Sequence, residues 1–173
     1  ELMVDVITCG FAAVQALAED PSIKLPIHVH RTMHGAITRN KDHGVSMRVF
    51  SKLVRMCGGD ALHVGTFGVG KMKGSPKEDL ANQDACIDPK MPYKPVMPVA
   101  SGGMHPALIE PLVKITGTNI QIQAGGGVAG HPRGVRGGAL AMVQAVDAAF
   151  EGIPFSEYAQ THKELREAIA KWG

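Results

Sequence analysis

Five short apolar runs, separated by helical patterns, constrain the fold of this chain most. The runs cover Met3–Cys9, Leu25–His30, Ala61–Val64, Val96–Ala100 and Ile120–Ala124. Because they are nearly continuous in apolar residues, they are typical of strands buried on both faces of a parallel sheet. Strand followed by helix, repeated, predicts successive parallel β/α units. The fold class is therefore α/β, and the pattern alone leaves open a doubly wound sheet or part of an eight-stranded barrel.

Helical patterns fill the intervals between the runs. We expect helices over Phe11–Glu19, Val45–Met56, Pro106–Thr116, Gly137–Phe150 and Ser156–Lys171. The second helix should pack through one face, formed by Val45, Val49, Leu53 and Met56. Gly58 should end it.

Two proline-containing segments predict local structure. Ser75-Pro76-Lys77-Glu78 matches a capping box with proline in the first helical position, so a further helix should begin there. Pro89–Pro98 has proline at four positions and predicts an extended connector.

Composition favours one globular domain. The chain has 173 residues, 45% apolar and 20% charged, and a formal net charge of +2. This charge argues against a nucleic-acid surface and suits a small anionic ligand.

The three cysteines form no C-x-x-C pair, so we expect neither disulfides nor a zinc site. We therefore expect the protein to work in a reducing cytoplasm. No run reaches membrane-spanning length. The abrupt start at Glu1 suggests a fragment.

A glycine-rich segment, Gly65–Gly74, follows the third predicted strand. Glycine occupies four of its ten positions, which permits backbone angles that other residues avoid and favours a mobile loop. Lys71 is then the cation that a closing loop would deliver to a ligand. The alternative is a solvated lysine, which we expect for Lys73.

Histidines gather at the ends of two predicted strands. Alternation puts His28 and His30 on one side of their strand and Arg31 on the other. Metal binding is disfavoured because no acidic residue lies nearby in sequence and no zinc spacing is present, so proton transfer or phosphate contact is the better interpretation. His28 and His34, taken singly, suit hydrogen-bonded core histidines. His63 precedes the glycine-rich segment, which favours a functional role over a structural one.

Two glycine clusters follow the last two predicted strands. Ser101–Gly103 and Gly125–Gly127 each place bare backbone N–H groups after a buried strand, where they can converge on an anionic oxygen. Together they predict one phosphate site. The alternative is that the glycines serve turns and close packing, as we expect for Gly127, Gly130 and Gly134.

Four motifs in one order resemble ribulose-1,5-bisphosphate carboxylase (RuBisCO) large subunits, in their archaeal form. The motifs are His28–His34, Gly58–Thr66 with Gly70-Lys71, Pro98–Gly103, and Gln123–Gly127 with Gly130–Pro132. The resemblance extends from residue 1 to about Phe150 or beyond. It implies that the five strands are strands four to eight of a TIM (β/α)8 barrel, followed by C-terminal helices. Residues 1–173 would then be a partial catalytic barrel, with the N-terminal domain and first barrel strands absent.

The resemblance also implies roles for individual residues. His30 and Lys71 would be catalytic: His30 would contact a substrate hydroxyl and assist proton movement, and Lys71 would meet the carboxylate formed from carbon dioxide. The substrate-binding residues would be Arg31, His63, Ser101, Gly102, Gly103, Gly125 and Gly126. Of these, Arg31 and His63 would hold one phosphate, and the remainder would bind sugar oxygens and the other phosphate.

One departure from the family pattern limits what this chain can do. The family holds Mg²⁺ with a carbamylated lysine, an Asp and a Glu, and the sequence contains no Lys-x-Asp-Glu segment. We therefore expect no metal ligand here, Mg²⁺ only in the full-length enzyme, and an inactive isolated chain.

The resemblance implies partners and leaves alternatives. Ribulose-1,5-bisphosphate and carbon dioxide would be the substrates of the parent enzyme, which yields 3-phosphoglycerate. We expect a homodimer or higher oligomer, since a partial barrel leaves open sheet edges. A RuBisCO-like enolase or isomerase fragment and a non-catalytic assembly module remain alternatives.

Overall fold

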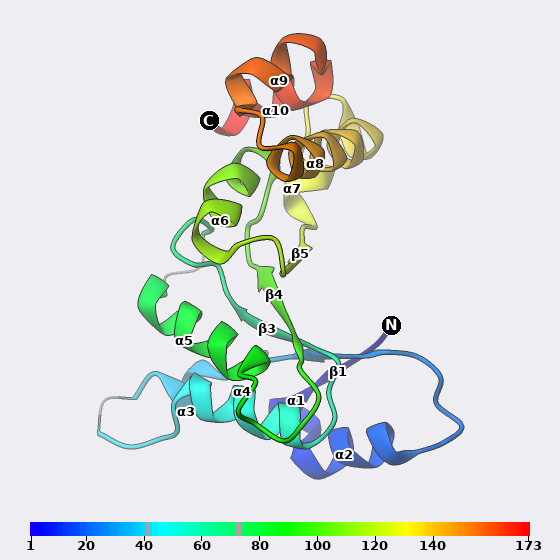
Figure 1. Ribbon diagram of the computed structural model, residues 1–173, viewed down its shortest axis with the longest axis vertical. Helices are drawn as coiled ribbons and strands as arrows, with labels where there is room; N and C mark the ends of the chain where they lie inside the picture. Colours follow the sequence, from blue (N-terminus) through cyan, green and yellow to red (C-terminus); the bar gives the residue numbers. More distant parts are fainter. Residues whose placement is uncertain (41, 72–73) are drawn as a thin grey trace. The chain divides into compact units, whose positions relative to one another are not determined.

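Five strands form the sheet of the computed structural model, which describes residues 1–40, 42–71 and 74–173 (Figure 1). They are β1 (Leu2–Asp5), β2 (Ile27–His30), β3 (Ala61–Gly65), β4 (Met97–Ser101) and β5 (Gln121–Gln123). The strand order follows the sequence, β1-β2-β3-β4-β5. β1 pairs with β2 in parallel, which sets Asp5 opposite His30, and β2 pairs with β3 in parallel, which sets His28 opposite Ala61. The prediction of successive parallel β/α units is confirmed.

Helices follow the strands. They are α1 (Val6–Cys9), α2 (Phe11–Glu19), α3 (Gly35–Thr38), α4 (Met47–Met56), α5 (Pro76–Ile87), the 3₁₀ turn η1 (Pro106–Leu108), α6 (Ile109–Thr116), α7 (Gly126–Ala129), α8 (Gly134–Glu151), α9 (Phe155–Thr161) and α10 (Lys163–Trp172). The predicted bounds of α2 are confirmed, as is the helix start at Pro76. Among the residues described, no helix has the length and apolarity needed to cross a membrane.

The chain divides into two compact units. The first unit contains residues 1–64 and 75–99, and the second contains residues 65–74 and 100–173. In the first unit, α4 packs beside α5 over buried residues such as Val54 and Cys86 (Figure 1). In the second, α8 packs against α6 and α10 around Ile109, Ala145 and Leu165.

The first predicted strand is wrong in its second half. Met3–Cys9 was expected to be one strand, but the strand ends at Asp5 and Val6–Cys9 is helical. The cause is a side-chain cap: Asp5 Oδ1 accepts hydrogen bonds from the backbone N–H groups of Ile7 (3.1 Å) and Thr8 (2.9 Å). β1 is also not buried on both faces, since Met3 is 51% exposed.

The predicted packing face of α4 is wrong. Val45, Val49 and Met56 are exposed, while Met47, Phe50 and Val54 are buried. Both sets have helical spacing, so the pattern alone could not separate them. The Phe50 ring decides the face because it packs against the Phe11 ring of α2, with centroids 5.3 Å apart.

The predicted helix over Ser156–Lys171 is two helices. Its backbone turns extended at His162 (φ −113°, ψ 95°), between α9 and α10. The break lets Phe155 of α9 and Leu165 of α10 enter the same buried cluster. The Ser75 hydroxyl makes no capping bond among the described residues, so the predicted capping box is absent there.

The proline-rich connector is anchored by Arg55 of α4. This arginine is buried, and its guanidinium donates to the backbone carbonyls of Asp88 (2.8 Å), Tyr93 (2.6 Å) and Lys94 (3.0 Å). The connector ends before Met97, where β4 begins.

Candidate functional site

Three histidines gather in the first unit, at and beside the carboxyl ends of β2 and β3. His63 Nε2 lies 2.7 Å from His28 Nε2, a hydrogen-bonding distance. The His30 ring lies edge-on to the His63 ring, with centroids 4.3 Å apart. His28 and His63 are buried, and His30 is partly exposed at the strand end. His30 is therefore the most exposed histidine of this cluster.

Each of the two β2 histidines has an acidic partner, although the sequence showed none nearby. His28 Nδ1 lies 2.9 Å from a Glu1 carboxylate oxygen, and His30 Nδ1 lies 3.4 Å from Asp5 Oδ2. Both carboxylates come from the neighbouring strand region, about 25 residues earlier in the chain. The parallel pairing of β1 with β2 is the signal that would have located them, because it sets Asp5 opposite His30.

Asp5 and Thr32 surround His30, and neither was among the predicted site residues. The Thr32 backbone N–H donates to Asp5 Oδ2 (2.6 Å), and Thr32 Oγ1 lies 2.5 Å from His30 Nδ1. Burial acts to raise the pKa of Asp5, but hydrogen bonds from Thr8 and Thr32 outweigh it and lower the pKa to about 2. Asp5 is therefore ionised at neutral pH beside His30.

Arg31 is half-buried in the first unit. Burial lowers its pKa, whereas the carboxylates of Asp79 and Glu78 on α5 act to raise it. His34 is a different case: burial, followed by the charges of Arg31 and Arg39, lowers its pKa to about 4. His34 is therefore neutral at physiological pH, with Nδ1 2.8 Å from the Thr38 hydroxyl, which agrees with a hydrogen-bonded structural histidine.

The second unit places Lys71 against the first glycine cluster. The Lys71 backbone N–H donates to the carbonyl oxygen of Gly102 (3.2 Å). Gly103 has a positive φ of 78°, and a Cβ built there would lie 2.8 Å from Lys71 Cγ. A Cβ on Gly70 would lie 2.7 Å from the Gly102 carbonyl oxygen. Glycine at 70 and 103 thus lets the loop approach the strand end, and Lys71 itself is exposed. Lys73 lies outside the described residues.

The second glycine cluster is open to solvent. Gly125 and Gly126 are exposed, and a Cβ built on either meets nothing within 4 Å. Gly127 differs, because a Cβ there would lie 2.0 Å from the Met104 carbonyl oxygen. The packing interpretation is thus confirmed for Gly127, while space for a ligand remains beside Gly125 and Gly126. Ser101 ends β4 and is partly exposed.

Metal binding finds no support in the described residues. Across 1–40, 42–71 and 74–173, no group of three or more His, Cys, Asp or Glu side chains is placed to hold a metal ion. The histidine cluster of β2 and β3 therefore does not amount to a metal centre.

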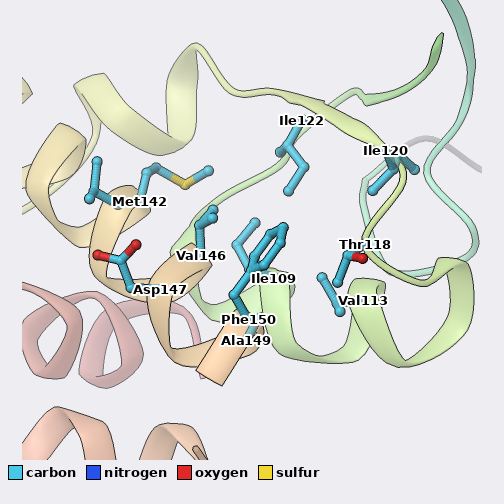
Figure 2. Close-up of a pocket in the computed structure, with 11 residues that line it drawn as sticks. Ile109, Val113, Thr118, Ile120, Ile122, Met142, Val146, Asp147, Ala149 and Phe150 are labelled. Carbon is cyan, nitrogen blue, oxygen red and sulfur yellow. The ribbon is translucent and has the colours of Figure 1, made fainter. Parts of the chain in front are cut away.

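An apolar pocket of about 350 Å³ lies in the second unit, and its lining includes none of the predicted site residues. Figure 2 shows it between α6, α8 and the segment around β5, with Ile109, Ile122 and Val146 among its lining residues. Its rim includes Phe150, which is 65% exposed. The lining is almost entirely aliphatic and aromatic, so the pocket suits an apolar surface rather than a phosphate.

Residues 1–172 match the family model described as ribulose bisphosphate carboxylase large chain, catalytic domain. The chain is 44% identical over 173 residues to a ribulose bisphosphate carboxylase of Pyrococcus abyssi, an alignment that covers 99% of this chain and 41% of the relative. The chain thus spans about two fifths of the length of the curated relatives that it matches.

Solved structures agree with the sequence matches. An octameric Rubisco from Pyrococcus horikoshii superposes with a TM-score of 0.92 at 43% identity, covering 98% of this chain and 40% of that one. A rubisco-like protein from Alicyclobacillus acidocaldarius gives a TM-score of 0.91 at 31% identity, covering 99% of this chain and 43% of that one. Sequence identity is therefore higher to the carboxylases than to the rubisco-like protein, while the fold is shared with both groups.

Proposed function

The chain belongs to the ribulose bisphosphate carboxylase large-chain family, and we propose that it supplies the part of the catalytic barrel that grips the sugar bisphosphate and presents a loop lysine. The proposed reaction of the whole enzyme is the addition of carbon dioxide to ribulose-1,5-bisphosphate, which yields 3-phosphoglycerate. The matched segment is about two fifths of such an enzyme, so the complete reaction requires groups from the remainder.

One observation carries the proposal. The Lys71 N–H···O=C Gly102 hydrogen bond holds the loop lysine beside the Ser101–Gly103 cluster, within a single compact unit. The lysine cation and the unshielded glycine N–H groups can both bind an anionic ligand. The lysine can also stabilise negative charge that develops on the ligand during a reaction. We propose that Lys71 stabilises the new carboxylate and that Ser101, Gly102, Gly103, Gly125 and Gly126 bind sugar oxygens and one phosphate.

The first unit has the chemistry for the other functions of the site. We propose that Arg31 and His63 bind the second phosphate, since a guanidinium and an imidazole both donate to phosphate oxygens. His30, exposed at the end of β2, would exchange a proton with a substrate hydroxyl through Nε2. Its Nδ1 faces Asp5 and Thr32, so Nε2 is the nitrogen left for substrate.

Magnesium does not fit the residues described. The family uses Mg²⁺, yet no suitable group of His, Cys, Asp or Glu side chains occurs among the described residues. We propose that its ligands come from the part of the enzyme outside the matched segment, and we assign no step to the metal here. The 173-residue polypeptide made on its own should therefore not fix carbon dioxide.

We propose that residues 1–173 form part of a single eight-stranded barrel, as strands four to eight and the following helices. β1 and β5 are the edges of the described sheet, and the remaining strands would pair with them. The apolar pocket beside β5 would be covered by the adjoining strand and helix. Assembly as a homodimer or higher oligomer is proposed by similarity to the octameric relative.

Carboxylation is favoured over the chemistry of rubisco-like proteins. Identity is 44% to the Pyrococcus abyssi carboxylase and 31% to the Alicyclobacillus acidocaldarius rubisco-like protein. An enolase or isomerase acting on a phosphosugar is the second candidate, because the fold matches it with a TM-score of 0.91. Both candidates need the phosphate-binding groups, and Lys71 is the residue that favours carboxylation.

A chimaera tests the proposal. In it, this chain replaces the matching segment of the Pyrococcus abyssi carboxylase, and labelled carbon dioxide is followed into 3-phosphoglycerate. The proposal predicts fixation that depends on ribulose-1,5-bisphosphate. A folded chimaera that enolises phosphosugars but fixes no carbon dioxide would favour the second candidate, and the parent carboxylase serves as the positive control.

We propose a cytoplasmic location. Cys9, Cys57 and Cys86 are all free thiols, and burial raises the pKa of Cys86 to about 12, so it is protonated and unreactive. Free cysteines are usual in a reducing compartment.

A further inference from the structure

The surroundings of His30 Nδ1 decide which ring nitrogen carries the proton. Three groups approach Nδ1: the Thr32 hydroxyl at 2.5 Å, the Thr32 backbone N–H at 3.1 Å and Asp5 Oδ2 at 3.4 Å. A carboxylate only accepts, a backbone N–H only donates and a hydroxyl does either. The proton position therefore depends on how these three groups are already engaged.

The Thr32 backbone N–H is engaged by Asp5. It donates to Asp5 Oδ2 at 2.6 Å and also to His30 Nδ1 at 3.1 Å, and the shorter, charge-assisted bond to the carboxylate is the stronger of the two. Asp5 Oδ1 is occupied as well, because it accepts from the backbone N–H and the hydroxyl of Thr8. The carboxylate thus fixes the backbone of Thr32, and this in turn fixes its hydroxyl beside Nδ1.

We propose that Thr32 is a positioning residue which, together with Asp5, keeps the proton of neutral His30 on Nδ1 and leaves Nε2 as the proton acceptor. Nδ1–H donates to Thr32 Oγ1, and Asp5 Oδ2 is the second acceptor nearby. Nε2 has no hydrogen-bond partner among the described residues, so it is free to take a proton from a ligand. When Nε2 is protonated, Nδ1–H keeps the same acceptors and the Asp5 charge offsets the new positive charge.

The other groups around His30 do not compete for Nδ1. From β3, the His63 ring makes an edge-on contact with the His30 ring, and His63 Nε2 lies 2.7 Å from His28 Nε2. Arg31, the next residue along the chain, lies beyond the end of β2, and the charges that act on it include Asp79 and Glu78 of α5. Asp5 is therefore the one ionised carboxylate paired with His30 among the described residues.

His131 in the second unit supplies a contrast within the same chain. The backbone N–H of Arg133 donates to His131 Nδ1 (3.1 Å), and Nε2 lies 3.0 Å from the backbone carbonyl oxygen of Glu164. A donor at Nδ1 and an acceptor at Nε2 place the proton of His131 on Nε2. The two histidines should thus hold opposite tautomers, which provides an internal reference.

The test is long-range ¹⁵N–¹H correlation on the histidine-labelled 173-residue chain at alkaline pH. We expect His30 with the proton on Nδ1 and His131 with the proton on Nε2. Thr32→Ser keeps the hydroxyl and should leave His30 unchanged. Thr32→Val removes it at nearly constant shape and should move His30 toward the Nε2–H form, with His131 unaffected. Thr32→Ala must give the same result as Thr32→Val.

Two results would overturn the inference: an Nε2–H tautomer at His30 in the unaltered chain, or an unchanged His30 spectrum in Thr32→Val and Thr32→Ala. Thr32 is exposed and its backbone bond to Asp5 survives these changes, so the fold should persist.

The importance of this tautomer for catalysis rests on the proposed function. In the chimaera, Thr32→Val should lower kcat roughly tenfold or more and change KM little. This loss is smaller than the roughly 10²–10⁴-fold contribution of a complete general acid–base catalyst, because His30 itself is still present. Thr32→Ser keeps the hydroxyl and should have the kcat of the unaltered chimaera. If the tautomer moves in Thr32→Val but kcat does not, the positioning role stands and the proposed role of His30 fails.

Discussion

The backbone N–H of Lys71 donates a hydrogen bond to the carbonyl oxygen of Gly102, at 3.2 Å. This bond joins the glycine-rich loop after β3 to the end of β4 within one compact unit. The Lys71 charge also acts on His105. Burial is the larger cause and the Lys71 charge the second cause of a lowered pKa of His105, so His105 favours its neutral form. Lys71 thus has a defined position against the glycine cluster.

Gly103→Ala should displace Lys71. The new Cβ would lie 2.8 Å from Lys71 Cγ and 2.9 Å from its Cβ, at a residue with φ of 78°. We expect the positive φ to cost roughly 1–2 kcal/mol of stability, and carboxylation by the chimaera to fall about tenfold or more because a transition-state donor is misplaced, with little change in ribulose-1,5-bisphosphate affinity. Urea unfolding and the carboxylation rate measure the two effects.

Gly152→Ala is the matched control for Gly103→Ala. Gly152 has φ of 69° and a Cβ there meets nothing within 4 Å, so backbone strain is reproduced without contact with Lys71. It should lose similar stability and keep its carboxylation rate. Equal carboxylation rates in both variants would contradict the proposed role of the Lys71–Gly103 contact.

His34→Gln should make the free energy of unfolding less dependent on pH on the acid side of neutrality. Burial, then Arg31 and Arg39, lower the pKa of folded His34 from 6.5 to about 4. Between these values the unfolded chain binds more protons than the folded chain, so the free energy of unfolding falls as pH drops from 6.5 toward 4. This part of the loss should disappear in His34→Gln and remain in His43→Gln, since His43 is exposed. Urea unfolding across this pH range checks it, and identical slopes in the two variants would be evidence against it.

Arg55→Leu should destabilise the first unit by about 3 kcal/mol or more, since hydrogen bonds to a charged group are each worth about 1.5–3 kcal/mol. The substitution removes the Arg55 donor from the backbone carbonyls of Asp88, Tyr93 and Lys94. Arg48 lies on the same helix but is exposed, so Arg48→Leu should change stability little. Thermal or urea unfolding compares the two, and a similar loss in both would argue against the anchoring role.

Phe150→Asp should reduce self-association of the 173-residue chain. Phe150 is 65% exposed at the rim of the apolar pocket, a surface that we propose the rest of the barrel covers. Val135 is 63% exposed on the same helix but does not line the pocket, so Val135→Asp is the control. Size-exclusion chromatography with light scattering should show an oligomer that only Phe150→Asp dissociates. A stable monomer of the unaltered chain would contradict this expectation.

Local sequence patterns predicted the elements that depend on near neighbours. The bounds of α2, the start of α5 at Pro76 and the apolar runs of β2 and β3 follow from periodicity and turn residues. The pattern could not choose between two apolar stripes on α4, because only the tertiary contact of Phe50 with Phe11 separates them. It also could not see that Asp5 ends β1 early by capping α1.

The candidate site shows the same division. Glycine content and strand ends located Lys71 and Gly103, and alternation located His28 and His30. Asp5 and Thr32 were missed because their importance depends on strand register and on a hydrogen bond to Nδ1, which only the fold brings about. Residues that act through a neighbouring strand are thus the hardest to predict from sequence.

The carboxylation rate of the Lys71→Ala chimaera, measured together with its affinity for ribulose-1,5-bisphosphate, tests the central claim most directly. If Lys71 stabilises charge that develops during the reaction, removal should lower carboxylation by roughly 10²–10³-fold, as for the loss of one transition-state donor, and change ligand affinity only a few-fold. Unchanged carboxylation in a folded Lys71→Ala chimaera, or an equal loss of binding and rate, would contradict the account.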